Sequence, residues 1–334
     1  MKTTQHEWRA LAILASALLG LAGCGGGSGA TDPPPPDNTQ RNLAAATTAS
    51  SPTNACAPIR PFYWELGDAS GRLASASVDS THSALHYVAT TVMGIASASK
   101  WLYGAYVVER RGAAGLNADD VKSLTFRSGY TRFTACLPGQ TVDACVAYST
   151  NGDYIAATDG KFLYGGGHMQ VHASRLGLGP LDSAALATEL RSQLGSDIVL
   201  GYSQPQLAGG VRTDADDYAR FLRKLLSGAL RMGVALGTNP VCTNPQTCST
   251  ALGTPVPPSE SWHYSIGHWV EDDPVVGDGA FSSAGAFGFY PWVDASKRYY
   301  GIVAREDAQA SAAGDASVDC GRIIRRAWMT GIAQ

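Results

Sequence analysis

The sequence predicts an α/β protein of the α+β type, with an antiparallel sheet built from N- and C-terminal strands and a helical insert between them. Aromatic and β-branched residues are concentrated at 59–66 and again at 286–293 and 299–305. Such runs favour strands, and the last two, joined by residues 294–298, predict a hairpin. Between the ends, residues 218–226 place their apolar side chains on one helical face, which predicts an amphipathic helix.

The first half of the domain is expected to alternate short elements with turns. The strand at 59–66 precedes a glycine-bounded turn at 67–71, whereas residues 84–92 favour no single structure. An apolar helix containing Ser97 is expected to end near Gly112. Asn117 precedes Ala-Asp-Asp in a pattern typical of a helix N-cap.

The second half is expected to be helical before it returns to strands. Residues 169–176 favour a helix, and Thr213 is the expected N-cap of the amphipathic helix at 218–226. The proline-containing segment 240–258 predicts a loop-rich insertion. Residues 320–329 predict a final helix.

The first 23 residues have the composition of an export signal, because a basic start precedes an apolar run too short to span a bilayer comfortably. The run ends in Leu-Ala-Gly-Cys24, which resembles a bacterial lipobox and implies a diacylglyceryl thioether on Cys24. An ordinary secretory peptide with a coincidental cysteine is the alternative. Two or more acyl chains anchor a protein stably. We therefore expect a lipid-anchored protein of the cell envelope, at the periplasmic face of the outer membrane.

Residues 24–55 are rich in Gly, Ser, Thr, Ala and Pro and contain almost no large apolar side chains. Such a segment buries too little apolar surface to offset the entropy lost on ordering, so it is predicted to be a flexible tether. The alternative is a segment that caps the folded domain. Residues 56–334 are expected to form the folded domain, since 45% of the chain is hydrophobic and 16% charged. A net charge of −3 without a basic run makes nucleic acid an unexpected partner.

Besides Cys24 the chain has an even number of cysteines, which in an exported protein indicates disulfides. These candidates are Cys56, Cys136, Cys145, Cys242, Cys248 and Cys320. The middle four could close two short loops in sequence order, and the first and last would then join the two ends of the domain. The sequence leaves other pairings open. None of the cysteines has the two-residue spacing of a zinc knuckle, so a metal is not expected.

Ser97-x-x-Lys100 is the one Ser-x-x-Lys of the chain, and it opens the apolar helix. Residues three apart lie on the same side of a helix, so Lys100 should stand one turn from Ser97. Burial disfavours the charged amine and lowers its pKa, and a neutral amine can take the serine proton. The alternative is a surface lysine one turn after an incidental serine.

Two histidine pairs, His82 with His86 and His168 with His172, have a spacing that can bind zinc when a third ligand is present. Neither pair has the intervening glutamate of a zinc motif, so packing or surface roles are expected. The aromatic-rich segment 262–270 is expected to be a core strand rather than a platform for substrate.

Five short segments follow one another in order after about residue 85. They are Ser97-x-x-Lys100, residues 124–129, Phe162-x-Tyr164, residues 205–210 leading into 217–221, and residues 283–289. This ordered set resembles the serine β-lactamase-related family, which includes class C β-lactamases, DD-peptidases and esterases built on the same fold. The resemblance implies a β-lactamase/transpeptidase-like fold and acyl transfer to water without a metal or organic cofactor.

The resemblance also assigns roles to residues. Ser97 would form the acyl-enzyme, Lys100 would be the base or its close partner, and Tyr164 would shuttle protons with the lysine. The backbone N–H groups of Ser97 and Ala286 would form the oxyanion hole. Ser283 and Gly285 would line the site, with Gly285 letting substrate approach the backbone.

Two positions depart from the family pattern. Gly166 stands where the family has the Asn of its Tyr-x-Asn motif, and Ser283 stands where it usually has Lys or His. Loss of that cation disfavours carboxylate-bearing substrates, so a neutral ester or amide is the expected substrate, with a cell-wall-related one less favoured. His168, close after Tyr164, is a candidate to line the pocket and partly replace the Asn. The alternative function is an inactive or weakly active binding protein of the envelope.

Overall fold

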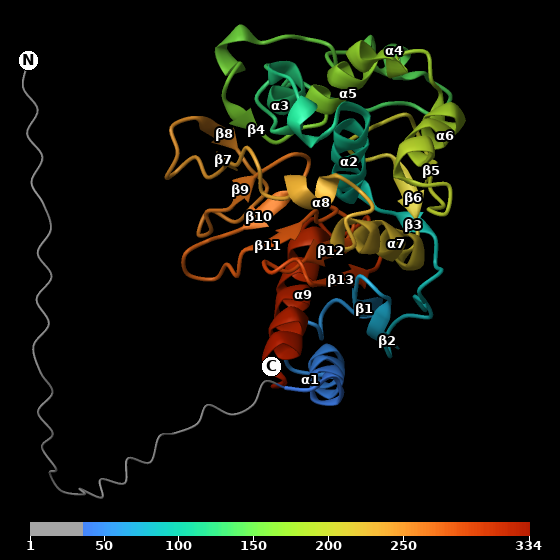
Figure 1. Cartoon of the computed structure of the whole chain (residues 1–334), viewed down its shortest axis with the longest axis vertical. Helices are drawn as coiled ribbons and strands as arrows, with labels where there is room; N and C mark the ends of the chain where they lie inside the picture. The colour runs from blue at the N-terminus through green and yellow to red at the C-terminus, as the bar shows by residue number, and fades with distance from the viewer. Residues whose placement is uncertain (1–35) are drawn as a thin grey trace, which may run out of the picture. The chain divides into compact units, whose positions relative to one another are not determined.

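An eight-stranded antiparallel sheet forms the centre of the protein, and the computed structural model describes residues 36–334 (Figure 1). The strand order is β2-β1-β13-β12-β11-β10-β9-β7. The strands are β1 (Phe62–Asp68), β2 (Arg72–Val78), β7 (Val241–Cys242), β9 (His263–Tyr264), β10 (Trp269–Glu271), β11 (Ala280–Ser282), β12 (Tyr290–Val293) and β13 (Tyr299–Ala304). The predicted sheet from both ends of the chain and its C-terminal hairpin are confirmed.

The pairing of β1 with β13 joins the two ends of the domain. Trp64 lies opposite Val303 in this antiparallel register. Successive side chains of a strand point to opposite faces. Tyr299 packs against Trp328 of α9 (Ala313–Thr330), whereas the hydroxyl of the next residue, Tyr300, accepts a hydrogen bond from Arg223 of α7 (Ala215–Leu226). The two helices therefore cover opposite faces, which explains why β1 and β13 are apolar along nearly their whole length.

The segment between β2 and β7 forms the predicted helical insert, most of which lies at the top of Figure 1. Its helices are α2 (Ser99–Arg111), α3 (Ala118–Leu124), α4 (Val142–Val146), α5 (Gly167–Ala173), α6 (Ser183–Leu194), α7 and α8 (Met232–Ala235). Two small sheets accompany them, one of β3 (Met93–Gly94), β6 (Val211–Thr213) and β5 (Gly201–Tyr202), the other of β4 (Phe162–Leu163) and β8 (Ala251–Gly253).

Helix starts follow local capping chemistry. Asn117 caps α3 as predicted, through a reciprocal pair of hydrogen bonds with Asp120. Thr213 does not cap α7, because its hydroxyl donates to the carbonyl of Val199, and the side chain of Asp214 caps the helix instead. The final helix also begins earlier than predicted, at Ala313 rather than Cys320.

The prediction of a flexible tether up to residue 55 is wrong for its second half. Residues Asn38–Ser50 form α1, which Asp37 caps and which packs against α9 (Figure 1). Its buried side chains are mainly alanines, whose small size lets two helices approach closely while giving the sequence little hydrophobic signal. For residues 38–50 the alternative prediction, a segment that caps the folded domain, is the correct one. The predicted signal peptide, Cys24 and the first part of the tether lie outside the described residues.

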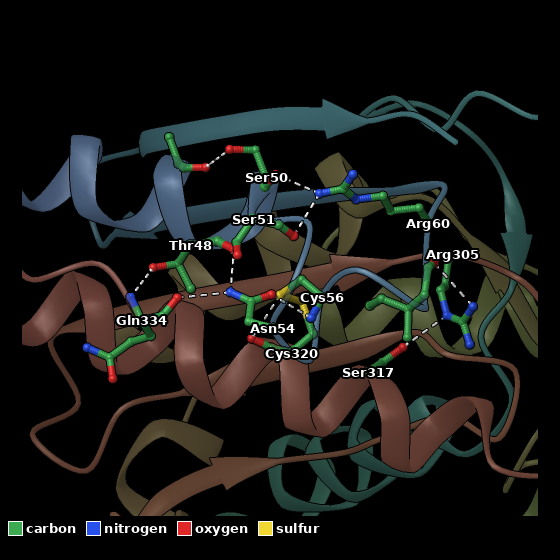
Figure 2. The surroundings of a disulfide bond; sticks show 12 residues. Thr48, Ser50, Ser51, Asn54, Cys56, Arg60, Arg305, Ser317, Cys320 and Gln334 are labelled. Atoms are coloured by element: carbon green, nitrogen blue, oxygen red, sulfur yellow. Dashed lines mark hydrogen bonds between the residues drawn. A yellow bond between two sulfur atoms is a disulfide. The ribbon is translucent and has the colours of Figure 1, made fainter. Parts of the chain in front are cut away.

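All three candidate cysteine pairs lie at bonding distance, as Cys56–Cys320, Cys136–Cys145 and Cys242–Cys248. Figure 2 shows the first of them where α1 meets α9. Around it, the amide of Asn54 donates to the carbonyls of Thr48 and Gln334. The disulfide and these hydrogen bonds fasten the start of the domain to its last residue.

We expect loss of the Cys56–Cys320 disulfide to lower the free energy of unfolding by about 3–5 kcal/mol, because a long closed loop restricts the unfolded chain most. This bond spans 264 residues, whereas Cys136–Cys145 spans 9. Urea unfolding of Cys56→Ser/Cys320→Ser should therefore show a larger loss than Cys136→Ser/Cys145→Ser. Equal losses in the two variants would contradict the expectation.

Candidate active site

Ser97 lies in a single tight turn, Ala96–Ala98, between β3 and α2. Ala96 has a φ of 43°, an unusual value for a residue with a side chain. The turn is held from both sides, since the N–H of Ile95 donates to the carbonyl of Val211 and the hydroxyl of Ser99 donates to the carbonyl of Ala96. Strain that its surroundings hold in place is typical of a functional turn.

Lys100 stands one helical turn from Ser97 as predicted, and it is 4% exposed. Its amine donates to the Oγ of Ser97 at 2.8 Å and to the carbonyl of Ala208 at 2.7 Å. Within residues 36–334 no carboxylate forms an ion pair with it. Burial lowers the pKa of Lys100 from 10.5 to about 7, so a large fraction of this amine is neutral near pH 7.

Tyr164, directly after β4, joins this pair. The amine of Lys100 lies over its ring, 4.7 Å from the centroid, and the ring stacks on Trp269 at 5.2 Å. Burial raises the pKa of Tyr164 to about 12, although hydrogen bonding with the side chains of Ser97 and Trp269 acts in the opposite direction. Tyr164 is thus a neutral phenol near pH 7, able to donate its proton and accept another.

Ala286 lies beside Ser97 in the turn that follows β11. In this turn the N–H of Gly285 donates to the carbonyl of Phe289 and that of Gly288 to the carbonyl of Gly285. Among the described residues the turn leaves the N–H of Ala286 without a backbone partner. A Cβ on Gly285 would lie 2.2 Å from the carbonyl oxygen of Ile95. Gly285 therefore lets this turn approach the turn of Ser97. It also lines a cavity beside Ser97, and its role toward substrate stays a prediction.

Ser283 does not line the site as predicted. Its side chain is 2% exposed, and its hydroxyl donates to the backbone carbonyl of Ser97 at 3.1 Å. A short side chain just after β11 can turn inward and reach this carbonyl. Ser283 therefore braces the turn of the nucleophile against the sheet.

His168 is also not a pocket residue, which contradicts the expectation that it replaces the missing Asn. It is 0% exposed; the N–H of Ser128 donates to its Nδ1, and its Nε2 lies 3.1 Å from the carbonyl of Leu163. Because Nδ1 accepts, Nε2 carries the proton. Burial lowers the pKa of His168 to about 4, so the ring is neutral and fixes the backbone beside Tyr164.

Gly166 lies at the edge of the site, but the space that a longer side chain would need at this position is already filled. A Cβ there would lie 2.9 Å from the ring of Phe133. The place where an Asn would project is therefore occupied by an aromatic ring from the loop after α3.

Two cavities open on either side of Ser97, and Ser97 and Ala286 line both. The first, here the aromatic cavity, has a volume of about 160 Å³ and is lined by Tyr164, Pro255, Val256, Pro257, Glu260, Trp262, Trp269, Ala284, Gly285, Gly314, Asp315, Val318, Asp319 and Arg322. The second, here the polar cavity, has a volume of about 340 Å³ and is lined by Gly94, Ala96, Lys100, Gly166, Ser203, Gln204, Gln206, Ala208, Gly209, Val211, Arg212, Phe287 and Glu306.

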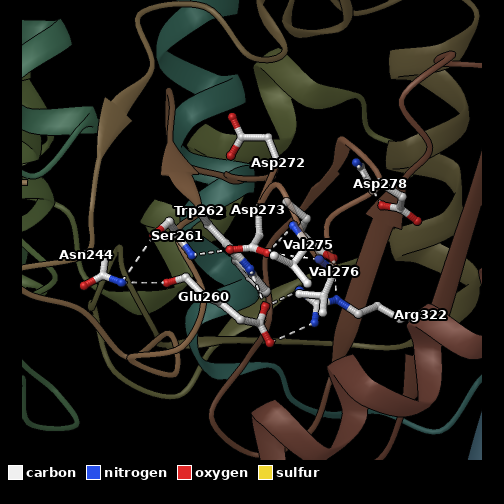
Figure 3. A network of polar contacts seen from close by, with 12 residues as sticks. Asn244, Glu260, Ser261, Trp262, Asp272, Asp273, Val275, Val276, Asp278 and Arg322 are labelled. Carbon is white, nitrogen blue, oxygen red and sulfur yellow. Dashed lines mark hydrogen bonds and ion pairs between the residues drawn. The ribbon is translucent and has the colours of Figure 1, made fainter. Parts of the chain in front are cut away.

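The walls of the aromatic cavity contain residues that the sequence did not mark as functional. Trp262 and Trp269 were expected only in a core strand, yet both are buried and also form the wall beside Ser97. Figure 3 shows Glu260 and Arg322 paired next to Trp262. Arg322 and its neighbours on α9 could not be assigned to the site because nothing in the sequence brings the last helix to Ser97.

Histidines of both predicted pairs contact other side chains of the protein. His172 lies between the hydroxyl of Tyr103 and the carboxylate of Asp120, and His86 pairs with Asp79 at the surface. In residues 36–334 no group of three or more His, Cys, Asp or Glu side chains is placed to hold a metal ion. The same part of the chain contains no helix that is both long and apolar enough to cross a membrane.

No protein-family model matches the sequence, and no curated protein matches it significantly. Solved structures do match the fold. A β-lactamase from Mycobacterium bovis has a TM-score of 0.51 at 14% identity, covering 81% of this chain and 96% of its own. The chain has the serine β-lactamase fold. A penicillin-binding protein homologue from Pyrococcus abyssi has a TM-score of 0.57 at 13% identity, with coverage of 84% and 76%.

A D-amino acid amidase from Ochrobactrum anthropi gives a TM-score of 0.56 at 11% identity, covering 87% of this chain and 97% of its own. These likenesses confirm the predicted β-lactamase/transpeptidase-like architecture. At such low identity they show the fold alone, so the chemistry of this β-lactamase-fold protein depends on its own residues.

Modification of Ser97 by a fluorophosphonate should slow as the pH falls below about 7, because protonated Lys100 cannot accept the serine proton. Intact mass against time, at a series of pH values, gives the rate. Lys100→Arg should lose modification at every pH up to neutrality and beyond, since a guanidinium stays charged. The surface variant Lys122→Met is the control, and a rate that does not change with pH would contradict a role for neutral Lys100.

Gly166→Asn should destabilise the protein by about 1–3 kcal/mol, because the added side chain meets the ring of Phe133. The matched control is Gly165→Asn, where the nearest atoms to a new Cβ lie at 4.0 Å. Thermal melting should show a lower midpoint for the first variant only, and a smaller loss in a Phe133→Ala background. Equal midpoints for Gly166→Asn and Gly165→Asn would show that Phe133 does not fill this space.

Proposed function

We propose that the protein is a serine hydrolase that forms an acyl-enzyme on Ser97. The observation that carries the proposal is the hydrogen bond of 2.8 Å between the amine of Lys100 and the Oγ of Ser97, at the point where two cavities meet. A buried lysine whose amine can be neutral supplies the base that a serine nucleophile needs.

The residues present support a two-step acyl transfer. Neutral Lys100 takes the proton of Ser97 as its Oγ attacks the substrate carbonyl, and the N–H groups of Ser97 and Ala286 stabilise the oxyanion. Tyr164, beneath the amine, passes a proton to the leaving oxygen or nitrogen as its bond to the carbonyl breaks. Water then attacks the acyl-enzyme and gives its proton to the Lys100–Tyr164 pair. The serine recovers its proton as the acid leaves.

The charges around Ser97 favour an ester or amide that lacks a carboxylate next to the reacting carbonyl. Ser283, which stands where the family usually has Lys or His, is uncharged and offers a substrate carboxylate no cation. Its hydroxyl instead donates to the carbonyl of Ser97. Arg322, the cation in the aromatic cavity, is held by Glu260 and Glu271. Arg212 lines the polar cavity, where the carboxylate of Glu306 offsets its charge.

The location is proposed from the sequence. The leader and Cys24 support a lipid-anchored protein facing the periplasm, where an ester or amide of the cell envelope would be the substrate. Labelling of Cys24 in cells grown with radioactive palmitate, compared with Cys24→Ser, tests the anchor.

Exposure of the full chain to a fluorophosphonate should add one adduct, and Ser97→Ala should add none. The wild type should also hydrolyse short p-nitrophenyl acyl esters well and a chromogenic cephalosporin weakly, and Ser97→Ala should lose both activities. Better turnover of the cephalosporin would contradict the substrate class. No adduct and no turnover would leave an envelope-binding protein on the same fold.

A further inference from the structure

The aromatic cavity has more negative than positive charge. Glu260, Asp315 and Asp319 line it, and Arg322 is its one cation among the described residues. Arg322 is not available to a ligand, because its two terminal nitrogens donate to Glu260 at 3.1 and 2.7 Å and its Nε donates to Glu271 at 3.1 Å. Figure 3 shows the pair of Glu260 and Arg322.

Asp315 and Asp319 are exposed and have no such hydrogen-bonded partner. They lie one turn apart on α9, and in the described part of the chain neither forms an ion pair or a side-chain hydrogen bond. Like charges at this spacing destabilise a helix. Partial burial raises the pKa of each carboxyl, Asp319 raises that of Asp315 further, and Glu260 raises both. The nearby charge of Arg322 lowers the pKa of Asp319 without cancelling the rise. A bound cation would remove this unfavourable interaction.

The walls of the cavity are of the kind that binds ammonium groups. Trp262 and Trp269 meet edge to face, with ring centroids 5.7 Å apart, and Tyr164 stacks on Trp269. The indole N–H of Trp262 donates to Glu260, which keeps the ring in place. Aromatic rings attract cations through their electron-rich faces, and the guanidinium of Arg322 already lies over the ring of Trp262, 4.8 Å from its centroid. Carboxylates add to that attraction. Val256 and Val318 complete an apolar path between Ser97 and α9.

Resting on the proposed function, we infer that the aromatic cavity selects substrates that carry an alkylammonium group. Ser97 attacks a neutral ester or amide carbonyl, an apolar linker lies against Trp262 and Trp269, and the ammonium group binds at Asp315 and Asp319. This departs from the expectation of a wholly neutral substrate, because only the reacting end is uncharged.

The polar cavity gives no comparable selection. Besides Lys100, it is lined by one residue of each sign, Arg212 and Glu306. The carboxylate of Glu306 already accepts the N–H of Gly94 at 3.1 Å. Charge selection therefore belongs to the aromatic side of Ser97.

The test compares p-nitrophenyl esters of ω-trimethylammonio fatty acids with matched esters in which a tert-butyl group replaces trimethylammonium, over a series of chain lengths. The two heads have nearly the same shape, so their ratio of kcat/KM isolates the charge. With the full chain in detergent we expect the cationic ester to be preferred about tenfold at low salt. The preference should shrink as salt is added.

Asp315→Asn/Asp319→Asn should reduce this ratio to about one. The control Asp79→Asn/Asp153→Asn removes the same charge from positions that line neither cavity, and it should keep the preference. Efficient hydrolysis of both esters at equal rates by the wild type would overturn the inference and leave the proposed hydrolase intact.

A second readout does not depend on turnover. Calorimetric titration of Ser97→Ala with hexyltrimethylammonium should show binding, and titration with hexanesulfonate should not. Adding Asp315→Asn/Asp319→Asn should weaken binding of the cation about tenfold or more. If no ester is hydrolysed and no fluorophosphonate adduct forms, the proposed function fails, and this titration still decides the charge preference: absence of cation binding overturns it.

Discussion

The removal of the Lys100 amine from water is the constraint on which the site depends. A pKa lowered from 10.5 to about 7 corresponds to roughly 5 kcal/mol against the charged form. Every residue from Ser99 to Val108 in α2 is buried, so the amine can be satisfied only by groups that the fold brings to it. The partners it finds are the Oγ of Ser97 and the carbonyl of Ala208, which precedes β6. The pairing of β3 with β6 holds both partners in place.

The same helix is pressed against the sheet at the turn between β9 and β10. A Cβ on Gly267 would lie 2.5 Å from the carbonyl oxygen of Lys100, and one on Gly104 would lie 2.7 Å from the carbonyl oxygen of Ile266. Backbone therefore meets backbone at this point, without side chains between. The strands on either side of this turn carry Tyr264 and Trp269, so the wall of the aromatic cavity is placed relative to Ser97 by direct contact with α2.

The parts of the site that could be predicted are those fixed by spacing along one element. Ser97 and Lys100 share a helical face, and Tyr164 follows from its place in an ordered set of motifs. The failures concern where a side chain points. Ser283 opens one of the motifs that surround the nucleophile, and His168 follows another. Both side chains nevertheless turn inward and hydrogen-bond to backbone groups. Spacing gives no information about such a choice.

The fold was predictable at its two ends and less so where small residues pack. The aromatic and β-branched runs gave β1, β12 and β13. In contrast, α1 buries alanines, and its packing on α9 depends on close approach rather than on large apolar side chains. The contribution of α9 to the site was also hidden, because α9 reaches Ser97 only through tertiary packing.

α9 divides its charges between two tasks, and this division gives the aromatic cavity its sign. Arg322 and Arg325 point to the sheet, where Glu271 accepts from both and Asp278 accepts from Arg325. The carboxylates of Asp315 and Asp319 remain at the cavity. The helix dipole stabilises Asp315, which lies in the first turn, but its effect falls off beyond that turn. Asp319 lies beyond that turn, where the nearby charge of Arg322 lowers its pKa without forming an ion pair with it. A cationic ligand in the cavity would stabilise both carboxylates further.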